Sequence, residues 1–487
     1  MRSGADFIES VRDGREVWLD GERVKDITTH PAFRNTTRSL AHLYDLAHSA
    51  ELRDELTTLS PYSDRRIHRA FQVAATRADL IAKRKAFKTV SEASFGFLGR
   101  SPDYMAAAAA GFAAAPQAFT GAVFDGAANV LAYHRRLAEN DLFQAHTLVN
   151  PQIDRTKAAS EQEENDLYLR VVRERDDGII VRGAKMMGTG AVFGDEILVG
   201  VTQPLAPGEA DYALSFSVPV STPGVKFISR VSYEAAASSV FDNPLASRFD
   251  ENDALVVYDN VFVPWENVLV YRDVEVCRAQ WWQTCAFVNL VHHGATRLWT
   301  KLEFLTGLAI LIAKANNTYG LPPVKAQIGR LIGWLNVLRS MVLGMEAECE
   351  PLVAAPHLVQ PNKEIGVAQL AIGPEIYPKV LAEIKLLAGG GLIQLPSSYR
   401  DLLSPEIEPV IARYIRSPGH DSQRRVKLFK LAWDALGSEF AGRHDQYERF
   451  YHGAPHVYLN TIAREADTDR YERLATACME GYQLDEQ

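Results

Sequence analysis

The sequence predicts a mainly helical α+β protein in which a β barrel lies between two helical regions. Apolar residues recur at helical spacing between residues 64 and 90, and short alternating strands crowd the stretch 142–271. Leucine-rich helical stripes return after residue 278. We therefore expect three domains, which are a helical N-terminal domain with a small β-hairpin (1–140), a central β-barrel domain (141–271) and a C-terminal helical bundle (272–487).

The N-terminal region opens with a predicted hairpin and continues as helices. Arg15–Val24 alternates apolar residues around an Asp-Gly turn, which is typical of a β-hairpin. The helical stripe that follows, within 64–90, consists of Ile67, Phe71, Ala74, Ala78 and Ile81. An alanine-rich helix comes later. Ser101 or Asp103 can cap it, and Pro102 occupies an early position where its missing N–H costs nothing.

The central region is organised around the stretch 166–202. Its first part alternates apolar and polar residues on either side of Asp176-Asp177-Gly178, which predicts a β-hairpin. The interval Met186–Ala191 then combines two methionines, two glycines and one threonine, which indicates a non-strand backbone close to a flat apolar ligand. Residues 255–266 look like two strand pieces joined by Asp-Asn. Several such short strands predict a compact barrel or sandwich.

Two long apolar stripes in the C-terminal region predict the helices of a bundle. They lie within 298–312 and 328–345, and further helices are expected near 367–370 and 426–436. His292-His293 is placed just before the first bundle helix. No Cys or acid adjoins this pair, so a metal site is not expected. The triplet Gly389-Gly390-Gly391 fits either a close backbone approach to a ligand or neighbouring subunit, or a helix C-terminus.

Composition and charge exclude several classes of protein. With 52 basic and 61 acidic residues the net charge is −9, which opposes non-specific binding to nucleic acid. Apolar runs fall short of the ~20 residues of a membrane-spanning helix, and the N-terminus lacks the apolar core of a secretory signal. We therefore expect a cytoplasmic protein with no membrane partner. The four cysteines have no CxxC spacing, which favours buried free thiols and no metal.

Missing motifs narrow the classes further. The chain has no GxGxxG after a strand, no GxxxxGK[ST], no HExxH and no GxSxG. These absences argue against four classes of enzyme, which are Rossmann dehydrogenases, P-loop NTPases, zincins and α/β-hydrolases.

Three polar clusters are candidate ligand sites. Arg100 and Tyr104 lie near a helix N-terminus, whose positive end favours an anionic oxygen; the alternative is that Arg100 pairs with a surface acid. His146 lies at a domain junction, where ligand sites tend to form, although a histidine among apolar residues is more often a core residue. Asn150, Gln152, Asp154 and Arg155 follow it. The aromatic and basic stretch 447–455 suits a nucleotide, with surface packing as the alternative.

The order of helices, β domain and helical bundle resembles that of the acyl-CoA dehydrogenase-like flavoproteins. Within that group the chain closely resembles the 4-hydroxyphenylacetate 3-monooxygenase oxygenase-component family, which includes chlorophenol and nitrophenol monooxygenases. The motifs that carry this resemblance span nearly the whole chain: GREVWLDGERVKDITTHPAFRN, GRSPDYM, HTLVNPQIDR, VRGAKMMGTGAVFGDEILV, VFVPWENV, HHGATRLWTKLEFLTGLA and GSEFAGRHDQYERFYHG.

The resemblance implies the oxygenase component of a two-component flavin monooxygenase. A partner reductase would use NADH to supply reduced FAD, which reacts with O2 to give a C4a-hydroperoxyflavin. That species would hydroxylate a phenol such as 4-hydroxyphenylacetate, or attack a chlorophenol or nitrophenol with loss of the substituent. A homotetramer is also implied.

The resemblance also assigns roles to individual residues. Arg100, Tyr104 and His146 would hold the substrate oxygen as a phenolate, and Thr189 would face the flavin N5 edge. Thr202 matches a position near the other end of the substrate, and either His292 or His293 would lie over the flavin and border the substrate. The remaining expected flavin contacts, together with His146, are Gln152, Ile153, Asp154, Arg155, Gly188, Gly190, Tyr451, Gly453 and Pro455.

Three other interpretations remain. A 4-hydroxybutyryl-CoA dehydratase shares the architecture but binds an iron–sulfur cluster through cysteines, and Gly99–Tyr104 contains none. An acyl-CoA dehydrogenase would need a catalytic glutamate over the flavin, which we cannot locate. A non-catalytic tetrameric scaffold would leave Arg100, Tyr104, His146 and Thr189 without a common purpose.

Overall fold

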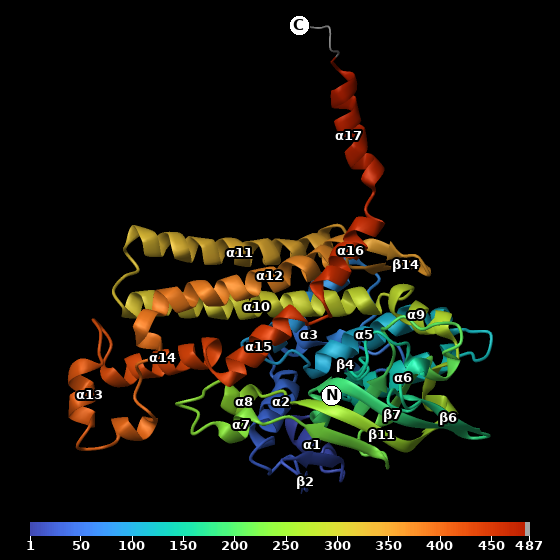
Figure 1. Ribbon diagram of the computed structural model, residues 1–487, viewed down its shortest axis with the longest axis horizontal. Coiled ribbons are helices and arrows are strands. Elements are labelled where there is room, and N and C mark those ends of the chain that lie inside the picture. Colours follow the sequence, from blue (N-terminus) through green and yellow to red (C-terminus); the bar gives the residue numbers. More distant parts are fainter. Residues whose placement is uncertain (483–487) are drawn as a thin grey trace.

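The computed structural model describes residues 1–482 and is mainly helical, with a β region between two helical regions. Figure 1 shows the long C-terminal helices side by side, with the sheets and the N-terminal helices beneath them. The helices of the N-terminal region are α1 (Gly4–Ser10), α2 (Arg34–Leu46), α3 (Arg53–Leu56), α4 (Arg77–Glu92), α5 (Pro102–Ala114) and α6 (Ala127–Asn140). The predicted fold class is confirmed.

Helix α4 is shorter than the apolar stripe suggested. It begins at Arg77, where Thr76 and Asp79 form a reciprocal capping box. Ile67 lies in the short strand β4 (Arg66–His68), which pairs with β3 (Thr57–Leu59), and Phe71 ends a 3₁₀ turn. The helical spacing of Ile67 and Phe71 in the sequence was therefore misleading, because one lies in a short strand and the other in a turn. Helix α5 does begin at Pro102, as predicted.

The β region consists of two sheets and not of a closed barrel within residues 1–482. The larger sheet has six strands in the order β2-β1-β10-β11-β7-β6, and the smaller has four in the order β12-β9-β8-β5. Their bounds are β1 (Glu16–Leu19), β2 (Glu22–Val24), β5 (Gln144–Thr147), β6 (Arg170–Arg175), β7 (Gly178–Thr189), β8 (Glu196–Val199), β9 (Leu214–Pro219), β10 (Val225–Ser229), β11 (Asp253–Pro264) and β12 (Val268–Tyr271).

The two sheets face each other through buried side chains. Thr147 of β5 lies 3.0 Å from the Tyr258 hydroxyl of β11, and the rings of Phe216 and Tyr258 have centroids 6.1 Å apart. The predicted barrel is therefore wrong, because strand alternation shows that each strand has one buried face but cannot show whether the outer strands pair. The N-terminal hairpin β1–β2 extends the larger sheet by pairing β1 with β10.

Strands β7 and β11 are each longer than predicted. Strand β7 continues through the methionine and glycine interval to Thr189, and its register against β11 shifts between Lys185 and Gly188. Met187 adopts a left-handed φ of 63° at this bulge. Strand β11 is one strand and not two, with a second bulge that includes Asn260 at φ 53°. The expected breaks are bulges within continuous strands.

The C-terminal region is a bundle built on three long helices that pack on one another. Helix α10 also packs on α4 and α5 of the N-terminal region. The elements are α9 (Val274–Trp282), α10 (Ala286–Ala315), α11 (Pro322–Ala347), β13 (Glu350–Leu352), β14 (Ala355–Gln360), α12 (Lys363–Ala388), α13 (Glu408–Tyr414), α14 (Ser422–Leu436), α15 (Glu439–Arg449), α16 (Pro455–Glu465) and α17 (Thr468–Glu480). Short helices α7 (Tyr233–Ala236) and α8 (Ala246–Phe249) belong to the β region.

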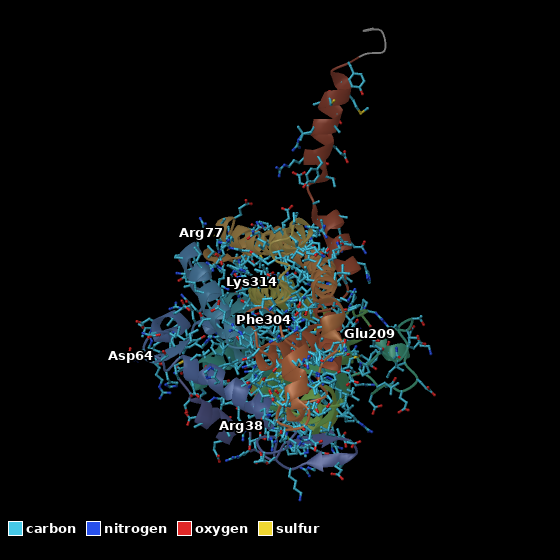
Figure 2. The ribbon with its side chains drawn as sticks, turned by 90° about the vertical axis from the view of Figure 1, so that its left-hand side faces the viewer. Arg38, Asp64, Arg77, Glu209, Phe304 and Lys314 are labelled. Atoms are coloured by element: carbon cyan, nitrogen blue, oxygen red, sulfur yellow. The ribbon has the colours of Figure 1, made fainter. Side chains whose placement is uncertain are left out.

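Three smaller features complete the fold. Helix α17 projects away from the rest of the chain in both views (Figures 1 and 2). Gly389 ends α12, so the glycine triplet lies at a helix C-terminus.

All four cysteines are free. Cys277 and Cys285 are buried as predicted, whereas Cys349 is half-buried and Cys478 is exposed. Within the described residues, no helix combines the length and the apolar character that crossing a bilayer requires.

Candidate functional site

Arg100 lies in the loop between α4 and α5, and both its backbone and its side chain are held. The Glu251 carboxylate accepts hydrogen bonds from the backbone N–H groups of Gly99 and Arg100, the second at 2.6 Å. The Arg100 guanidinium lies between two aromatic rings, 4.3 Å from the centroid of Tyr104 and 4.0 Å from that of Tyr451. Its Nη2 donates to the Tyr451 carbonyl at 2.8 Å. Arg100 therefore has a fixed position.

Tyr104 brings the predicted residues together. It lies on the first turn of α5, and its ring centroid is 5.6 Å from that of His146 on β5 and 5.2 Å from that of His293 on α10. Three regions of the chain thus meet around one phenol ring. We call Arg100, Tyr104, His146 and His293 the inner wall.

The two neighbouring histidines have different surroundings, and both lie inside α10, not before it as expected. His293 Nε2 lies 3.0 Å from Asp103 of α5, and its ring faces Tyr104. His292 Nε2 instead lies 3.0 Å from Glu346 of α11. Consecutive helical residues point about 100° apart, so only one of them can face α5. His293 is therefore the histidine of the pair that belongs to the inner wall.

The inner wall has one strong cation and a neutral imidazole. Burial and the Arg100 charge lower the pKa of His146 to about 3, so this ring is neutral near pH 7. Burial raises the pKa of Tyr104, so its hydroxyl keeps its proton. Among residues 1–482, Arg100 Nη1, His293 Nδ1 and His452 Nε2 are buried without a hydrogen-bond partner. Unpartnered buried polar atoms are costly, and here they suit a polar ligand.

Thr189 lies on the β side of the inner wall. It is 4% exposed at the end of β7, and its hydroxyl donates to Asp253 of β11 at 2.6 Å. Gly190 follows at a φ of 68°, and a Cβ there would lie 3.7 Å from Arg100 Cβ. Gly188 has another role, because a Cβ on it would lie only 2.8 Å from Val256. Gly188 is thus needed for packing against β11.

An acidic and basic cluster behind these residues was not predicted. Arg443 of α15 donates twice to Asp253, at 2.9 and 2.7 Å, and once to Glu251 at 2.8 Å. Glu251 holds the Arg100 backbone and Asp253 holds the Thr189 hydroxyl. One guanidinium from the C-terminal region thus ties together both sides of the site.

Other predicted residues lie apart from the inner wall. We call Gln152–Arg155 and Thr202 the rim. Gln152, Ile153, Arg155 and Thr202 are exposed, and Asp154 is half-buried. The Asp154 side chain accepts hydrogen bonds from Thr156, two residues along. These contacts are local, and the structure does not bring the rim together with the inner wall.

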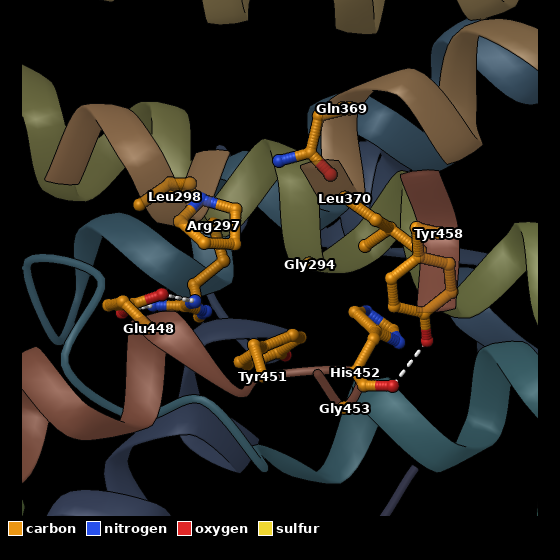
Figure 3. A pocket seen from close by; sticks show the side chains of 11 residues that line it. Gly294, Arg297, Leu298, Gln369, Leu370, Glu448, Tyr451, His452, Gly453 and Tyr458 are labelled. Carbon is orange, nitrogen blue, oxygen red and sulfur yellow. Dashed lines mark hydrogen bonds and ion pairs between the residues drawn. The ribbon is translucent and has the colours of Figure 1, made fainter. Parts of the chain in front are cut away.

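A small pocket on the other side of Tyr451 includes two of the predicted residues. Figure 3 shows it between α10, α12 and the segment that joins α15 to α16. Tyr451 and Gly453 line it, whereas Pro455 starts α16 outside the lining. Arg297 and Glu448 form a buried bidentate pair at its edge, at 2.7 and 2.6 Å. The predicted aromatic and basic stretch thus lines this pocket and, through Tyr451, also contacts Arg100 and Tyr104 of the inner wall.

Several residues of the site escaped the sequence analysis. Glu251, Asp253 and Arg443 hold the predicted residues in place, whereas His452, whose ring centroid lies 6.4 Å from that of Tyr104, belongs to the predicted stretch 447–455. For Arg443 the sequence did hold a signal, because its spacing from Tyr447 on α15 places both side chains on one face of the helix. Glu251 and Asp253 gave no signal, because acids near a strand start are common.

Comparisons with known proteins identify the family of the chain. Two family models match the chain, 4-hydroxyphenylacetate 3-hydroxylase N terminal over residues 3–270 and C terminal over residues 277–480. The 4-hydroxyphenylacetate 3-monooxygenase oxygenase component of Klebsiella oxytoca is 38% identical over 99% of this chain and 93% of its own length. The 4-nitrophenol 2-monooxygenase oxygenase component of a Rhodococcus species is 37% identical over 99% and 93%.

A solved structure gives the same result for the fold. It is the oxygenase component (HpaB) of 4-hydroxyphenylacetate 3-monooxygenase complexed with FAD and 4-hydroxyphenylacetate. That protein is 32% identical, covers 99% of both chains and superposes with a TM-score of 0.94. The chain therefore belongs to the 4-hydroxyphenylacetate 3-hydroxylase family of flavin-dependent monooxygenase oxygenase components.

Proposed function

We propose that this chain is the oxygenase component of a two-component monooxygenase, which uses reduced FAD and O2 to hydroxylate a phenol. The observation that carries the proposal is the inner wall, where a half-buried guanidinium and a neutral imidazole flank one tyrosine ring. Family membership supports it, because the related proteins are named as oxygenase components acting on phenols.

Arg100 suits the binding of an ionised phenol. A free phenol has a pKa near 10, so a site at neutral pH must favour the anion. The Arg100 Nη1 group is buried and without a partner among residues 1–482, and an aryl oxygen would satisfy it. His146 is neutral, so it can share a hydrogen bond with that oxygen without competing for positive charge. Electron density on the ring rises when the oxygen is ionised, which favours oxygen transfer to the adjacent carbon.

The residues present also fit FAD. Thr189 offers a buried hydroxyl group, and Gly190 leaves the backbone beside Arg100 free of a side chain. Tyr451 and Gly453 line a neighbouring pocket, and His452 has an unpartnered buried nitrogen among residues 1–482. Reduced FAD, when bound, supplies the electrons that activate O2. We assign Thr189 to the N5 edge of the flavin and His293 to the side of the flavin site next to it. Tyr451 and Gly453 would be further flavin contacts. Gln152–Arg155 would cover the flavin from the rim.

The identity of the phenol is a separate question. The 4-hydroxyphenylacetate and 4-nitrophenol enzymes are 38% and 37% identical to this chain. A difference this small does not favour one substrate over the other. We propose a 4-substituted phenol whose far end lies near Thr202, either 4-hydroxyphenylacetate-like or carrying a chloro or nitro group that leaves.

A reductase and further copies of the chain are the proposed partners. An oxygenase component requires an NADH-dependent reductase to supply reduced FAD, by diffusion or by brief contact. The projecting α17 supports a homotetramer, because Tyr471, Leu474 and Met479 are each more than half exposed on it. A second copy can cover these exposed apolar side chains. Light scattering on a chain cut after residue 466 would test this assembly.

Other functions fit the site less well. Within the described residues, no group of three His, Cys, Asp or Glu side chains could hold a metal ion, and Gly99–Tyr104 contains no cysteine. An iron–sulfur cluster would therefore find no cysteine ligand in that segment. A non-catalytic scaffold does not explain why a cation and two imidazoles surround one tyrosine ring, with a buried threonine hydroxyl at the end of β7.

One experiment tests the proposal directly. The purified chain is mixed with photoreduced FAD, then with ¹⁸O2 and a panel of phenols that includes 4-hydroxyphenylacetate, 4-nitrophenol and chlorophenols. We expect one labelled catechol or quinone product to dominate. Oxygen uptake that yields only peroxide with every phenol would contradict the proposal.

A further inference from the structure

The Thr189 hydroxyl donates its hydrogen bond to the Asp253 carboxylate. Thr189 and Asp253 are opposite each other in the β7–β11 register, and the hydroxyl donates to the carboxylate at 2.6 Å. Thr189 is 4% exposed, so water cannot readily take the place of this acceptor. The direction of the bond depends on whether Asp253 is ionised.

Two arginines keep Asp253 ionised. Arg443 donates to both of its oxygens, at 2.9 and 2.7 Å, and Arg230 donates to one of them at 2.9 Å. Burial would raise the pKa of this carboxyl, but the two guanidiniums outweigh that effect and hold the pKa well below its usual range. An ionised carboxylate has no proton to donate. Thr189 must therefore be the donor, and only its oxygen lone pairs remain for a ligand.

We propose that Asp253 is a positioning residue that makes Thr189 a hydrogen-bond acceptor only, so that the site selects a ligand with a ring N–H at this point. The inference rests on the proposed function, in which Thr189 faces the flavin N5. Reduced flavin carries a hydrogen on N5, whereas oxidised flavin presents a lone pair there. The fixed hydroxyl thus favours reduced over oxidised FAD.

A purely electrostatic role for Asp253 predicts the opposite result. Reduced FAD at neutral pH carries one more negative charge on its ring than oxidised FAD, so a nearby carboxylate repels it. Removing that charge would then strengthen the preference for reduced FAD. Under the proposed role, removing it frees the hydroxyl to donate to oxidised FAD, and the preference weakens. The sign of the change separates the two roles.

The test measures binding and redox potential rather than turnover. Dissociation constants for oxidised and photoreduced FAD are determined without oxygen, together with the midpoint potential of bound FAD. In Asp253→Asn we expect the ratio of the oxidised to the reduced dissociation constant to fall about tenfold, the size of one hydrogen bond. For a two-electron couple that fall lowers the midpoint potential by about 30 mV.

Three further variants guard against a general loss of structure. Asp250 also binds Arg230, at 2.7 Å, but does not contact Thr189, so Asp250→Asn should keep the wild-type ratio. Thr189→Ser should keep it as well, because the hydroxyl remains. Thr189→Val should lower it as Asp253→Asn does. If Asp253→Asn does not fold, the comparison of Thr189→Ser with Thr189→Val still tests the proposal. The ratio of dissociation constants must fall in the Val variant and stay at the wild-type value in the Ser variant.

The outcomes separate this inference from the proposed function. An unchanged or increased ratio in both Asp253→Asn and Thr189→Val overturns the role of Asp253 while leaving the monooxygenase proposal intact. Failure of the wild-type chain to bind reduced FAD at all overturns the proposed function instead.

Discussion

The inner wall and the rim differ in how much of their structure exists before a ligand binds. In the inner wall, Arg100 is held by Glu251 through its backbone and by two aromatic rings through its guanidinium. In the rim, Gln152 and Thr202 are exposed, and Asp154 bonds only to near neighbours in sequence. We infer that recognition of the aryl oxygen is built into the fold, whereas the choice between substituents lies in the rim.

The largest expected effect comes from the centre of the inner wall. Arg100→Ala should lower product formation by roughly 10²–10³-fold, because one preorganised charge that stabilises the substrate oxygen is lost. Reduced FAD should still bind, and O2 should still be consumed, which oxygen uptake and product chromatography can separate. Arg100→Lys restores the charge without the planar fork and should recover part of the activity. Unchanged product formation in Arg100→Ala would remove Arg100 from the substrate site.

The stability of the two regions should differ as much as their chemistry. Glu448→Gln breaks the buried pair with Arg297 behind Tyr451 and should lower the free energy of unfolding by about 3–5 kcal/mol. At the rim, the exposed pair of Lys157 and Asp154 should contribute nothing measurable, so Asp154→Asn should leave Tm unchanged. Denaturant titration of both variants tests this contrast, and equal losses would refute it.

The same pair predicts a pH dependence. Arg297 and Lys301 outweigh the effect of burial and lower the pKa of Glu448 from its usual value near 4.5 to about 2. Because the folded pKa is the lower one, the stabilisation is complete above pH 4.5 and is lost as the pH falls towards 2. Glu448→Gln should therefore flatten the acid side of the stability curve. A curve parallel to that of the wild type would show that Glu448 is not the group responsible.

Thr189 should affect how efficiently electrons are used more than it affects substrate binding. Thr189→Ala removes the buried hydroxyl, so we expect several-fold more hydrogen peroxide per NADH consumed, with reductase supplying the reduced FAD. Thr189→Ser should remain near the wild type. Peroxide yield is measured against hydroxylated product, and an unchanged ratio in Thr189→Ala would remove Thr189 from the flavin edge.

The rim should give the smallest change in rate. Thr202→Ala should change KM by less than about tenfold, and by different factors for phenols that differ in their 4-substituent. The peroxide yield should stay constant because the inner wall is intact. A uniform loss of kcat across all phenols would place Thr202 in the reaction machinery instead.

We expect that the His146 imidazole does not titrate near neutral pH. Because burial and Arg100 lower the pKa of His146 to about 3, its ring in the ligand-free protein should stay neutral between pH 5 and 8. An ordinary histidine titrates near 6.5 in that window. NMR of the imidazole signals during a pH titration checks this, and a midpoint near 6.5 for His146 would show that the inner wall is open to water.

The sequence allowed prediction of features that depend on local chemistry. Arg100 and Tyr104 were identified by their place near a helix N-terminus, and the hairpin of β6 and β7 by alternation around Asp-Asp-Gly. The bulge at Met187 was taken for a break, because methionine and glycine are as common in loops as in bulges. The barrel was wrong because the pairing of outer strands depends on side chains distant in sequence.

The candidate site was predicted less completely than the fold. His146 was found because a polar residue in an apolar stretch is conspicuous, yet its low pKa depends on burial between packed regions and on a cation 46 residues earlier. Asp253 and Arg443 are 190 residues apart, and no local pattern links them. A choice between His292 and His293 required knowing which face of α10 meets α5. Such pairings arise only when the regions pack.

The contact that Arg443 makes with Glu251 and Asp253 limits how such enzymes can be recombined. A hybrid that takes its first half from one homologue and its C-terminal half from another would join acids from one parent to an arginine from the other. Unless both parents keep the same spacing there, the junction would leave Glu251 without its arginine partner and Asp253 with Arg230 alone. Crossover points for shuffling libraries should therefore keep residues 251–253 and 443 from a common parent.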